Sequence, residues 1–577
     1  MTAAYSQIWR KKIMDNTIEV NEVSKWALRL KMHYKKGVNL LDCIFQAPVT
    51  AKKFIDEGAG LLCIYGVIDR NAAELIEIVE RYGYGDEAFT RYLNILLVLD
   101  MDNMAAYTAS QTAMRKIAAS TTAMTAVAAS PTAMAAIWND VDALAIVQAS
   151  SAWEVFTSAA SAAIGKAVAM IAGLNPNSFA DMEAVAESAM PAIAASETAM
   201  MAVVTNAVAL TIAIESSTAM TAVAESETAM GVVVASSVAM SALAASAAAL
   251  NAVVSSYIAM AAIWLESKAL AIMQGNGSAW VKFTGAVSAV IGKAVAMIAG
   301  LNPNSFADMA AVAASNTAMT SIAAYSTALA AVWTNDIAIK AVQAAPAAWA
   351  AITSASSDVL GKSVAIMAKL EPDSYADVAA LAASPVAMAA VAAMSPAIMA
   401  LITNTGALGI VVASSTAMTA IAASSVAIAA VIATTAALTA VAASTLAMTA
   451  VVASSVGFGA IRLNAAARNA VTASSVARSA IAGSDRKTSI QVSVSQGAWN
   501  DIASSVAYII SLKPTDATFR QWTINRTYAA AETVESQWQS SISSTDAVGI
   551  NRFTSQNTPQ VNAGATGGFC QVEYIRA

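Results

Sequence analysis

A ten-residue repeat runs through most of this sequence and constrains its fold more than any other feature. Methionine or another large apolar residue recurs every ten positions within the unit Ser-x-Thr-Ala-Met-x-Ala-Val-Ala-x. The clearest runs span residues 104–134, 190–260, 309–329 and 408–458. Such regular spacing does not arise by chance, so the chain from about 104 to 480 must use one structural unit many times.

A period of ten does not fit one continuous helix. Ten residues of α-helix turn through roughly 1000°, about 80° short of three turns, so the methionine stripe would drift around the axis. Coiled coils need a period near 7 or 11. Alanine and methionine favour helix, and the unit lacks the strict alternation of a strand. We therefore predict a mainly α fold, a solenoid of two-turn helices that are stable only when stacked.

Serine marks the start of each short helix. Serine is a good N-cap and proline is tolerated at the first helical position, and this pair occurs at Ser130-Pro131, Ser384-Pro385 and Ser395-Pro396. With Ser120 as an N-cap, one face carries the expected core residues Ala123, Met124, Val127 and Ala128. If two such helices form each layer, about 350 residues would extend roughly 150–200 Å at the usual helix spacing.

A second, longer repeat interrupts the ten-residue pattern. Its copies share a tryptophan, a Gly-Lys pair and a Pro-containing turn, and they begin at Trp153, Trp280 and Trp349. The pairs are Gly165-Lys166, Gly292-Lys293 and Gly361-Lys362. We predict longer helical modules at about 138–182, 264–309 and 333–378, whose aromatic residues form local cores.

The two ends differ from the array. Residues 1–103 have ordinary composition, with charged helices expected at Arg70–Tyr82 and Asp86–Leu99, and we predict an N-terminal helical docking domain there. The solenoid should occupy 104–483, ending in atypical repeats where Arg468 and Arg478 replace methionine. Residues 484–577 should form a small α+β tip domain, with strands at Ile490–Ser495, Phe519–Tyr528 and Gly568–Arg576.

Composition argues against two classes of partner. The net charge of −6 and pI of about 5.1 leave no basic patch, so we expect no nucleic-acid binding. Hydrophobic residues make up 57% of the chain, and Val378–Ile461 carries no charge. Polar residues interrupt this stretch about every ten positions, so we expect no membrane span. Met1–Asn16 has basic residues but no apolar core, so we also expect no secretory signal peptide.

No constellation of catalytic or metal-binding residues is visible. The one histidine, His33, and the separated Cys43, Cys63 and Cys570 predict no metal site. The acids Asp140 and Asp142 are expected to cap a helix. The Gly-Lys pairs lack the first glycine of a phosphate-binding loop, and Ala160, Val287 and Ser356 stand in its place. We therefore expect no enzyme, no cofactor and no bound metal.

Aromatic residues of the C-terminal domain are the candidates for binding. Their rings would stack on a sugar or contact a partner protein, and the alternative is packing in the core of a small β domain. The candidate residues are Trp522, Tyr528, Trp538, Phe553 and Tyr574.

The repeat resembles arrays in virion proteins of tailed bacteriophages, often described as tail fibre proteins. The resemblance covers about 104–480, and the ending Gly567–Arg576 is similar to phage fibre C-termini. It implies a virion location as a tail fibre, whisker or collar component. It also implies several copies per particle, in a homo-oligomer or on other tail or neck proteins, and a tip that binds a host cell-surface glycan or another virion protein. The resemblance transfers no catalytic residue.

Other functions remain open from the sequence. A bacterial surface adhesin or spacer would normally need a signal peptide. An ice-binding solenoid would need a flat Ser/Thr face, which the tryptophan modules interrupt. An enzyme would need a concealed acid pair in the C-terminal domain. The uncharged stretch Val378–Ile461 also predicts close association between sister chains, because nothing on its Ser, Thr and Ala surface repels a neighbour.

Overall fold

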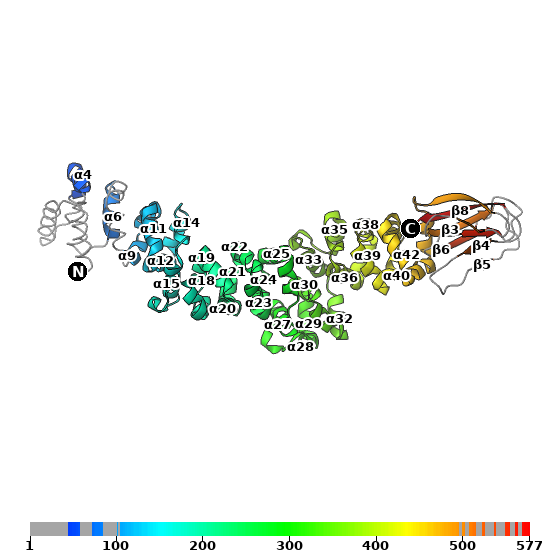
Figure 1. The fold of residues 1–577 in the computed structure, drawn as a ribbon, viewed down its shortest axis with the longest axis horizontal. Helices are drawn as coiled ribbons and strands as arrows, with labels where there is room; N and C mark the ends of the chain where they lie inside the picture. The colour runs from blue at the N-terminus through cyan, green and yellow to red at the C-terminus, as the bar shows by residue number, and fades with distance from the viewer. Residues whose placement is uncertain are drawn as a thin grey trace. The chain divides into compact units, whose positions relative to one another are not determined.

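The computed structural model describes residues 44–57, 72–84, 101, 104–494, 499–501, 507–514, 522–525, 536–537, 548–553, 560–563 and 568–576. Short helices follow one another along most of the chain, and strands follow them (Figure 1). The chain divides into two compact units, Met1–Phe283 and Thr284–Ala577, and each contains part of the helical array. The predicted mainly α solenoid of two-turn helices is confirmed.

The first unit holds the described helices from α4 to α26. Among the described residues, α4 (Pro48–Glu57) and α6 (Ala72–Arg81) precede the array. The array begins with α9 (Met104–Thr108), α10 (Gln111–Ala118), α11 (Thr121–Ala129), α12 (Pro131–Trp138), α13 (Val141–Gln148), α14 (Trp153–Thr157) and α15 (Ser161–Ile171). It continues with η3 (Pro176–Ser178), α16 (Met182–Ser188), α17 (Met190–Ala194), α18 (Glu197–Thr205), α19 (Ala207–Glu215), α20 (Ser217–Ala224), α21 (Glu227–Ala235), α22 (Ser237–Ala245), α23 (Ala247–Ser255), α24 (Tyr257–Leu265), α25 (Ser267–Gly275) and α26 (Gly277–Thr284).

The second unit continues the same pattern. Its first helices are α27 (Ser288–Ile298), η4 (Pro303–Ser305), α28 (Met309–Ala313), α29 (Asn316–Ala324), α30 (Ser326–Thr334), α31 (Asp336–Gln343), α32 (Pro346–Thr353), α33 (Ser357–Met367), η5 (Pro372–Ser374) and α34 (Val378–Ala383). The regular helices that follow are α35 (Pro385–Ala392), α36 (Ser395–Thr403), α37 (Thr405–Ala413), α38 (Ser415–Ala423), α39 (Ser425–Ala433), α40 (Thr435–Ala443), α41 (Thr445–Ala453), α42 (Ser455–Leu463), α43 (Ala465–Ala473) and α44 (Ser475–Ala482).

Each ten-residue unit folds as one helix and one sharp corner. At Ser120 the backbone is extended (φ −110°, ψ 109°), and its side chain accepts a hydrogen bond from the Ala123 amide at 3.3 Å. Because the cap residue leaves helical geometry, successive helices change direction sharply. The bend between α21 and α22 is 102°. The predicted core face is confirmed, since Ala123, Met124, Val127 and Ala128 are all buried.

Three helices form one turn of the solenoid. Each helix packs mainly on the helix three places further along, as α20 does on α23 and α38 on α41. Some helices also touch the fourth, as α38 touches α42. The prediction of two helices per layer is therefore wrong. The repeat fixes where a helix stops, but the turn size depends on the bend at each corner, which near 100° brings the chain back over itself after three helices or slightly more.

The cap side chains also connect successive turns. Ser424 Oγ accepts from the Ala427 amide of its own helix and donates to the Ala392 carbonyl, 32 residues earlier, at 2.5 Å. The same spacing of 32 recurs at several corners in each unit. One hydroxyl thus begins a helix and satisfies a carbonyl at the end of a helix in the turn before it.

One predicted cap is displaced. Ser395 was expected to be an N-cap with Pro396 at the first helical position, but Met394 is the cap, Ser395 is the first helical residue and Pro396 the second. The reason is the phase of the array. Met394 lies ten residues after Ser384 and ten before Asn404, both of which are caps. The decad spacing overrides the local Ser-Pro preference, and α36 has no side-chain cap.

At the end of the array, arginine side chains replace the cap serines as hydrogen-bond donors to the preceding helices. In the last turn, the carbonyls of Val452, Arg462 and Thr472 occupy the positions that cap serines bond elsewhere. They accept from the side chains of Arg486 (2.7 Å), Arg468 (2.7 Å) and Arg478 (2.5 Å). Arg468 and Arg478, which were predicted to belong to capping repeats, and Arg486, which was not, therefore close the end by supplying donors that a further turn would have supplied.

Strands follow the last helix. They are β1 (Thr488–Val494), β2 (Trp499–Asp501), β3 (Ala507–Pro514), β4 (Trp522–Asn525), β5 (Ser536–Gln537), β6 (Val548–Phe553), β7 (Gln560–Ala563) and β8 (Gly568–Arg576). Two antiparallel four-stranded sheets form, in the orders β1-β8-β3-β6 and β2-β7-β4-β5. All three predicted strand segments contain a strand. The described residues beyond Ala482 hold no helix, so the helical part of the predicted α+β domain is not among them.

The described part of the N-terminal region is helical, as predicted for 70–82. Phe45 packs on Phe54 (5.7 Å between ring centroids) and stacks on Tyr82 (6.2 Å). Helix α6 contacts α10 of the array. Ser110, the cap of α10, donates to the Glu77 carboxylate, and Lys116 pairs with Glu80 at 3.3 Å. The helix predicted at 86–99 lies outside the described residues.

Replacing Val127 by aspartate should destabilise the protein by roughly 3 kcal/mol or more, because Val127 is 0% exposed and the carboxylate would be buried without a partner. Thermal or urea denaturation measures the loss. Thr122→Asp is the matched control, since Thr122 is exposed in the first turn of the same helix, where the dipole favours an acid. Equal stability of V127D and the wild type would show that the buried face is misassigned.

Replacing Arg478 by methionine, the residue typical of its repeat position, should loosen the last turn. The Thr472 carbonyl would lose its donor at a local cost of about 1–2 kcal/mol. Hydrogen exchange of the α43 and α44 amides should speed up, while that of α35 to α38 stays unchanged. Lys268→Met removes an exposed positive charge elsewhere and should leave exchange in α43 and α44 unaltered. Unchanged exchange in R478M contradicts the capping role.

Candidate functional site

The three tryptophan modules are the most elaborate features of the array. Each contains a helix of eleven residues, α15, α27 or α33, where regular helices have eight or nine. A 3-10 turn follows, and an aspartate then caps the next helix; in the first module Asp181 accepts from the Ala184 amide. The second module is divided between the units, with its aromatic cluster in the first and α27 in the second. The predicted insertion of longer helices is confirmed.

A cluster of aromatic rings anchors each module. Trp138 meets Trp153 at 6.0 Å and Phe156 at 5.8 Å between ring centroids. The second module repeats this geometry with Trp264, Trp280 and Phe283 at 5.7–5.9 Å. The third has Trp333 and Trp349 at 5.7 Å, with aliphatic Ile352 in the position of the phenylalanine. The predicted local aromatic cores are therefore present.

The first tryptophan of each cluster was missed by the sequence reasoning. Trp138, Trp264 and Trp333 are at most 5% exposed, and their indole nitrogens have no hydrogen-bond partner among the described residues. Their partners Trp153, Trp280 and Trp349 are half-buried. The available signal was a tryptophan fifteen or sixteen residues before each recognised one. The buried ring serves packing, and only the second ring reaches the surface.

The glycines of the Gly-Lys pairs allow two backbones to cross. A Cβ on Gly165 would lie 2.5 Å from the carbonyl carbon of Asp181, and one on Gly361 would lie 2.4 Å from that of Asp377. Gly292 makes the same close approach to Asp308. These distances are too short for any side chain, so the glycines are packing residues, as expected, and no phosphate-binding loop is formed. Lys362 pairs with Asp373 at 3.0 Å on the surface.

Asparagine is the cap residue at the corner whose hydrogen bond to an earlier turn spans each module. Asn206 donates to the Ala159 carbonyl at 3.0 Å and accepts from Ala209, while 1% exposed. Asn404 does the same with Ala355 at 2.9 Å, and Asn335 reaches both Thr284 and Ala286. These bonds span 47 to 51 residues instead of 32. The asparagine amide therefore makes the bond that spans each inserted module, and Asn276 makes the same kind of bond over the ordinary 32 residues, to the Ala244 carbonyl at 3.0 Å.

A shallow groove of about 550 Å³ lies beside the first module. Its lining is mostly alanine, and Lys166 is its one charged residue. The lining comes from α11, α12, α14 and α15, with Thr125, Pro131, Val155 and Ser158 as its other side chains. The lining holds no His, Cys, Asp or Glu side chain that could act as a base for its Ser158 and Thr125 hydroxyls.

The predicted binding residues of the C-terminal domain are only partly described. Trp522 lies in β4, Phe553 in β6 and Tyr574 in β8, in two different sheets. Tyr574 is 1% exposed, which fits the alternative of core packing rather than a ring offered to a ligand. Tyr528 and Trp538 lie outside the described residues. A binding role for the other four aromatics stays a prediction.

The remaining polar candidates have structural roles where they are described. Asp140 caps α13 by accepting from the Ala143 amide at 3.0 Å, and Asp142 lies in the first turn of that helix. The Ser356 hydroxyl donates to Asp358 and lowers the pKa of that exposed carboxyl. His33, Cys43 and Cys63 lie outside the described residues. Within the described ranges, no group of three or more His, Cys, Asp or Glu side chains could hold a metal.

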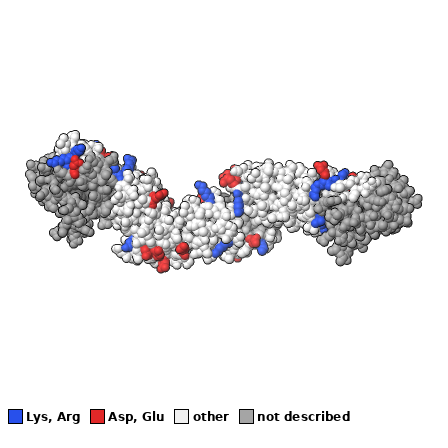
Figure 2. Space-filling model, turned by 45° about the horizontal axis from the view of Figure 1, so that its top comes forward, with Lys and Arg blue, Asp and Glu red and all other residues white. Residues whose placement is uncertain are grey.

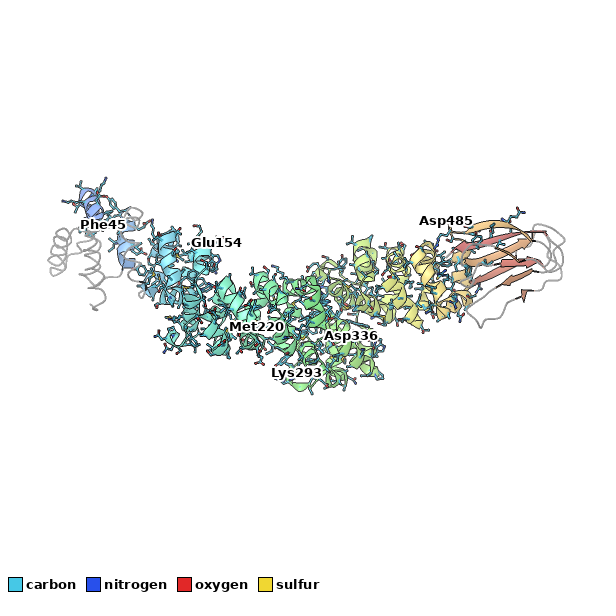
Figure 3. The ribbon with its side chains drawn as sticks, viewed as in Figure 1. Phe45, Glu154, Met220, Lys293, Asp336 and Asp485 are labelled. Atoms are coloured by element: carbon cyan, nitrogen blue, oxygen red, sulfur yellow. The ribbon has the colours of Figure 1, made fainter. Side chains whose placement is uncertain are left out.

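Charged side chains are sparse on the array. On the face shown in Figure 2 they form small separate groups on a mostly uncharged surface. Figure 3 contrasts Glu154, exposed at the edge of the first unit, with Met220, which is 2% exposed among the helices. Among the described helices none is both long and apolar enough to cross a membrane alone. Eight sharply bent helix pairs would satisfy the length and composition required.

Comparison with known proteins does not assign the chain to a family. No family model matches it, and no curated protein gives a significant match.

Gly361→Ala should destabilise the third module by several kcal/mol, on the order of 3, because the added methyl would overlap the Asp377 backbone and force α33 and α34 apart. Gly409→Ala is the matched control: Gly409 lies in the exposed part of α37 with no atom within 4 Å of the added methyl. It should stabilise by about 0.5–1 kcal/mol through helix propensity. If denaturation curves gave G361A and G409A the same free energy of unfolding, the close crossing of the two backbones at Gly361 would be contradicted.

Proposed function

We propose that the chain is a non-catalytic structural component of a phage virion, a spacer in a tail fibre, whisker or collar. Residues 1–103 attach it to tail or neck proteins, and residues 484–577 form a tip that contacts a host surface glycan or another virion protein. The observation that carries this proposal is the array itself. Hydroxyls of its cap serines bond one turn to the turn before, and different contacts close its two ends.

The bonding of the cap residues supports a spacer. A cap serine whose hydroxyl accepts within its helix and donates to the previous turn, as at Ser256 and Ser474, has no donor left for a ligand. The residues of the core face of each unit are buried, and its exposed positions are mainly Ser, Thr and Ala, with single exposed apolar side chains such as Val238 and Val386. Such a surface separates two functional ends without binding much itself.

The two closures support distinct roles for the ends. At the start of the array, Ser110 and Lys116 contact carboxylates of α6. At its end, arginines complete the last turn, and α43 contacts strand β6. These contacts close the described first and last turns of the array, which favours separate roles for the regions beyond them.

The threonine geometry weakens the ice-binding alternative. Exposed threonines of the repeat, such as Thr221, Thr439 and Thr449, donate their hydroxyl protons to the carbonyl four residues earlier at 2.8 Å. These hydroxyls therefore lack a donor for an ordered water lattice. The tryptophan modules further interrupt any regular face.

Mass spectrometry of purified particles of the phage that carries the gene tests the proposal. The chain should be present in several copies per particle. A chain without residues 1–103 should be absent from particles. A chain without residues 484–577 should be incorporated, and the particles should adsorb to host cells at least tenfold less. An intact chain that is missing from particles and found in a cell envelope would overturn the proposal in favour of the adhesin.

A further inference from the structure

The way turns contact one another indicates how the array responds to tension. In the regular part of the second unit, a helix contacts the next helix and those three or four places away, so its contacts reach only neighbouring turns. The bonds from Ser414, Ser424, Ser444, Ser454 and Ser474 likewise join one turn to the one before. No described strand or helix in this region clamps several turns together. Each turn can therefore open while the others stay folded.

Tension along the array acts directly on these bonds. Each cap bond points from one turn to the next, so separating two turns stretches it lengthwise. The regular turns are otherwise held by non-directional packing of aliphatic side chains, mainly the alanine, methionine and valine of each unit. Such turns offer little resistance compared with a sheet whose bonds must all break at once.

The tryptophan modules are built more strongly than the regular turns. The third module adds the contact of Trp333 with Trp349, the backbone crossing at Gly361 and the buried bond from Asn404 to Ala355. In the second module, Asn335 donates the two corresponding bonds, to Thr284 and Ala286. All the contacts of a module must break before a turn containing that module can open.

We propose that the array is a stepwise extensible element, in which regular turns open first under tension and the tryptophan modules act as stops. This goes beyond a spacer role, because the chain would lengthen under force and shorten again on release. The property belongs to the array alone, so it does not depend on the virion assignment.

The structure predicts two step lengths. A regular turn contains three units of ten residues, and its opening should release about 90–100 Å of extended chain after subtracting the folded height. The bond that spans a module covers 49 residues at Asn404 against 32 at Ser424, a difference of 17 residues. A module-containing turn should therefore release about 60 Å more than a regular turn.

The test is single-molecule stretching of the full chain, held by its two ends in an optical trap. The expected record is a series of short steps at low force, followed by longer steps at higher force, with stepwise return on relaxation. One release of several hundred ångströms would overturn the proposal, because the array would then open as a whole. The proposal would also be overturned if the long steps occurred at the same force as the short steps or at a lower force.

A matched pair of variants tests whether the third tryptophan module is one of the stops. Asn404→Ser keeps an N-cap acceptor but is too short to reach Ala355, so it should lower the force of one long step only. Asn464→Ser makes the same change at a regular corner, where the cap bond to Ala467 is retained, and should change no step. Unaltered short steps in the same record show that the N404S chain is folded. Equal effects of the two variants would contradict the assignment of the module as a stop.

Discussion

At most repeats the structure depends on one side chain, the serine or asparagine at the helix N-cap. Its oxygen accepts from the amide three residues on, which allows the helix to start after an extended corner residue. The same group donates to a carbonyl near the end of a helix in the preceding turn. A two-turn helix has too few internal bonds to persist alone in water. The cap residue therefore supplies both the break that shortens the helix and the bond that makes short helices stable together.

Sequence reasoning reached the fold through this residue, and it failed where geometry depends on more than one unit. The decad, the cap at Ser120 and the buried face of Val127 follow from helical periodicity and capping, and all were predicted. The number of helices per turn was not, because it depends on the angle at each corner. Met394 was missed as a cap because the phase of neighbouring turns outweighs the local Ser395-Pro396 signal.

The candidate sites were predicted less completely. The Gly-Lys glycines were correctly expected to pack, since their surroundings lack a phosphate-loop pattern, but the backbone they approach was not identifiable from sequence. The role of Asn404 was missed, although asparagine in place of serine after a module was a visible signal. The length of the Asn404 side chain becomes informative only when the position of the Ala355 carbonyl is known. For the same reason, nothing in the sequence separated buried Tyr574 from an aromatic residue at the surface.

Spin labels on exposed first-turn positions give the most direct test of three helices per turn joined by cap residues. Ser415, Thr435 and Thr445 are equivalent and exposed. Ser415 and Thr445 start α38 and α41, which pack on each other, so their labels should lie about 10 Å apart. Labels at Ser415 and Thr435 belong to different corners and should lie clearly further apart. Stronger dipolar broadening for 415/445 than for 415/435 is the predicted result, and the reverse order, which two helices per turn would give, would contradict the account.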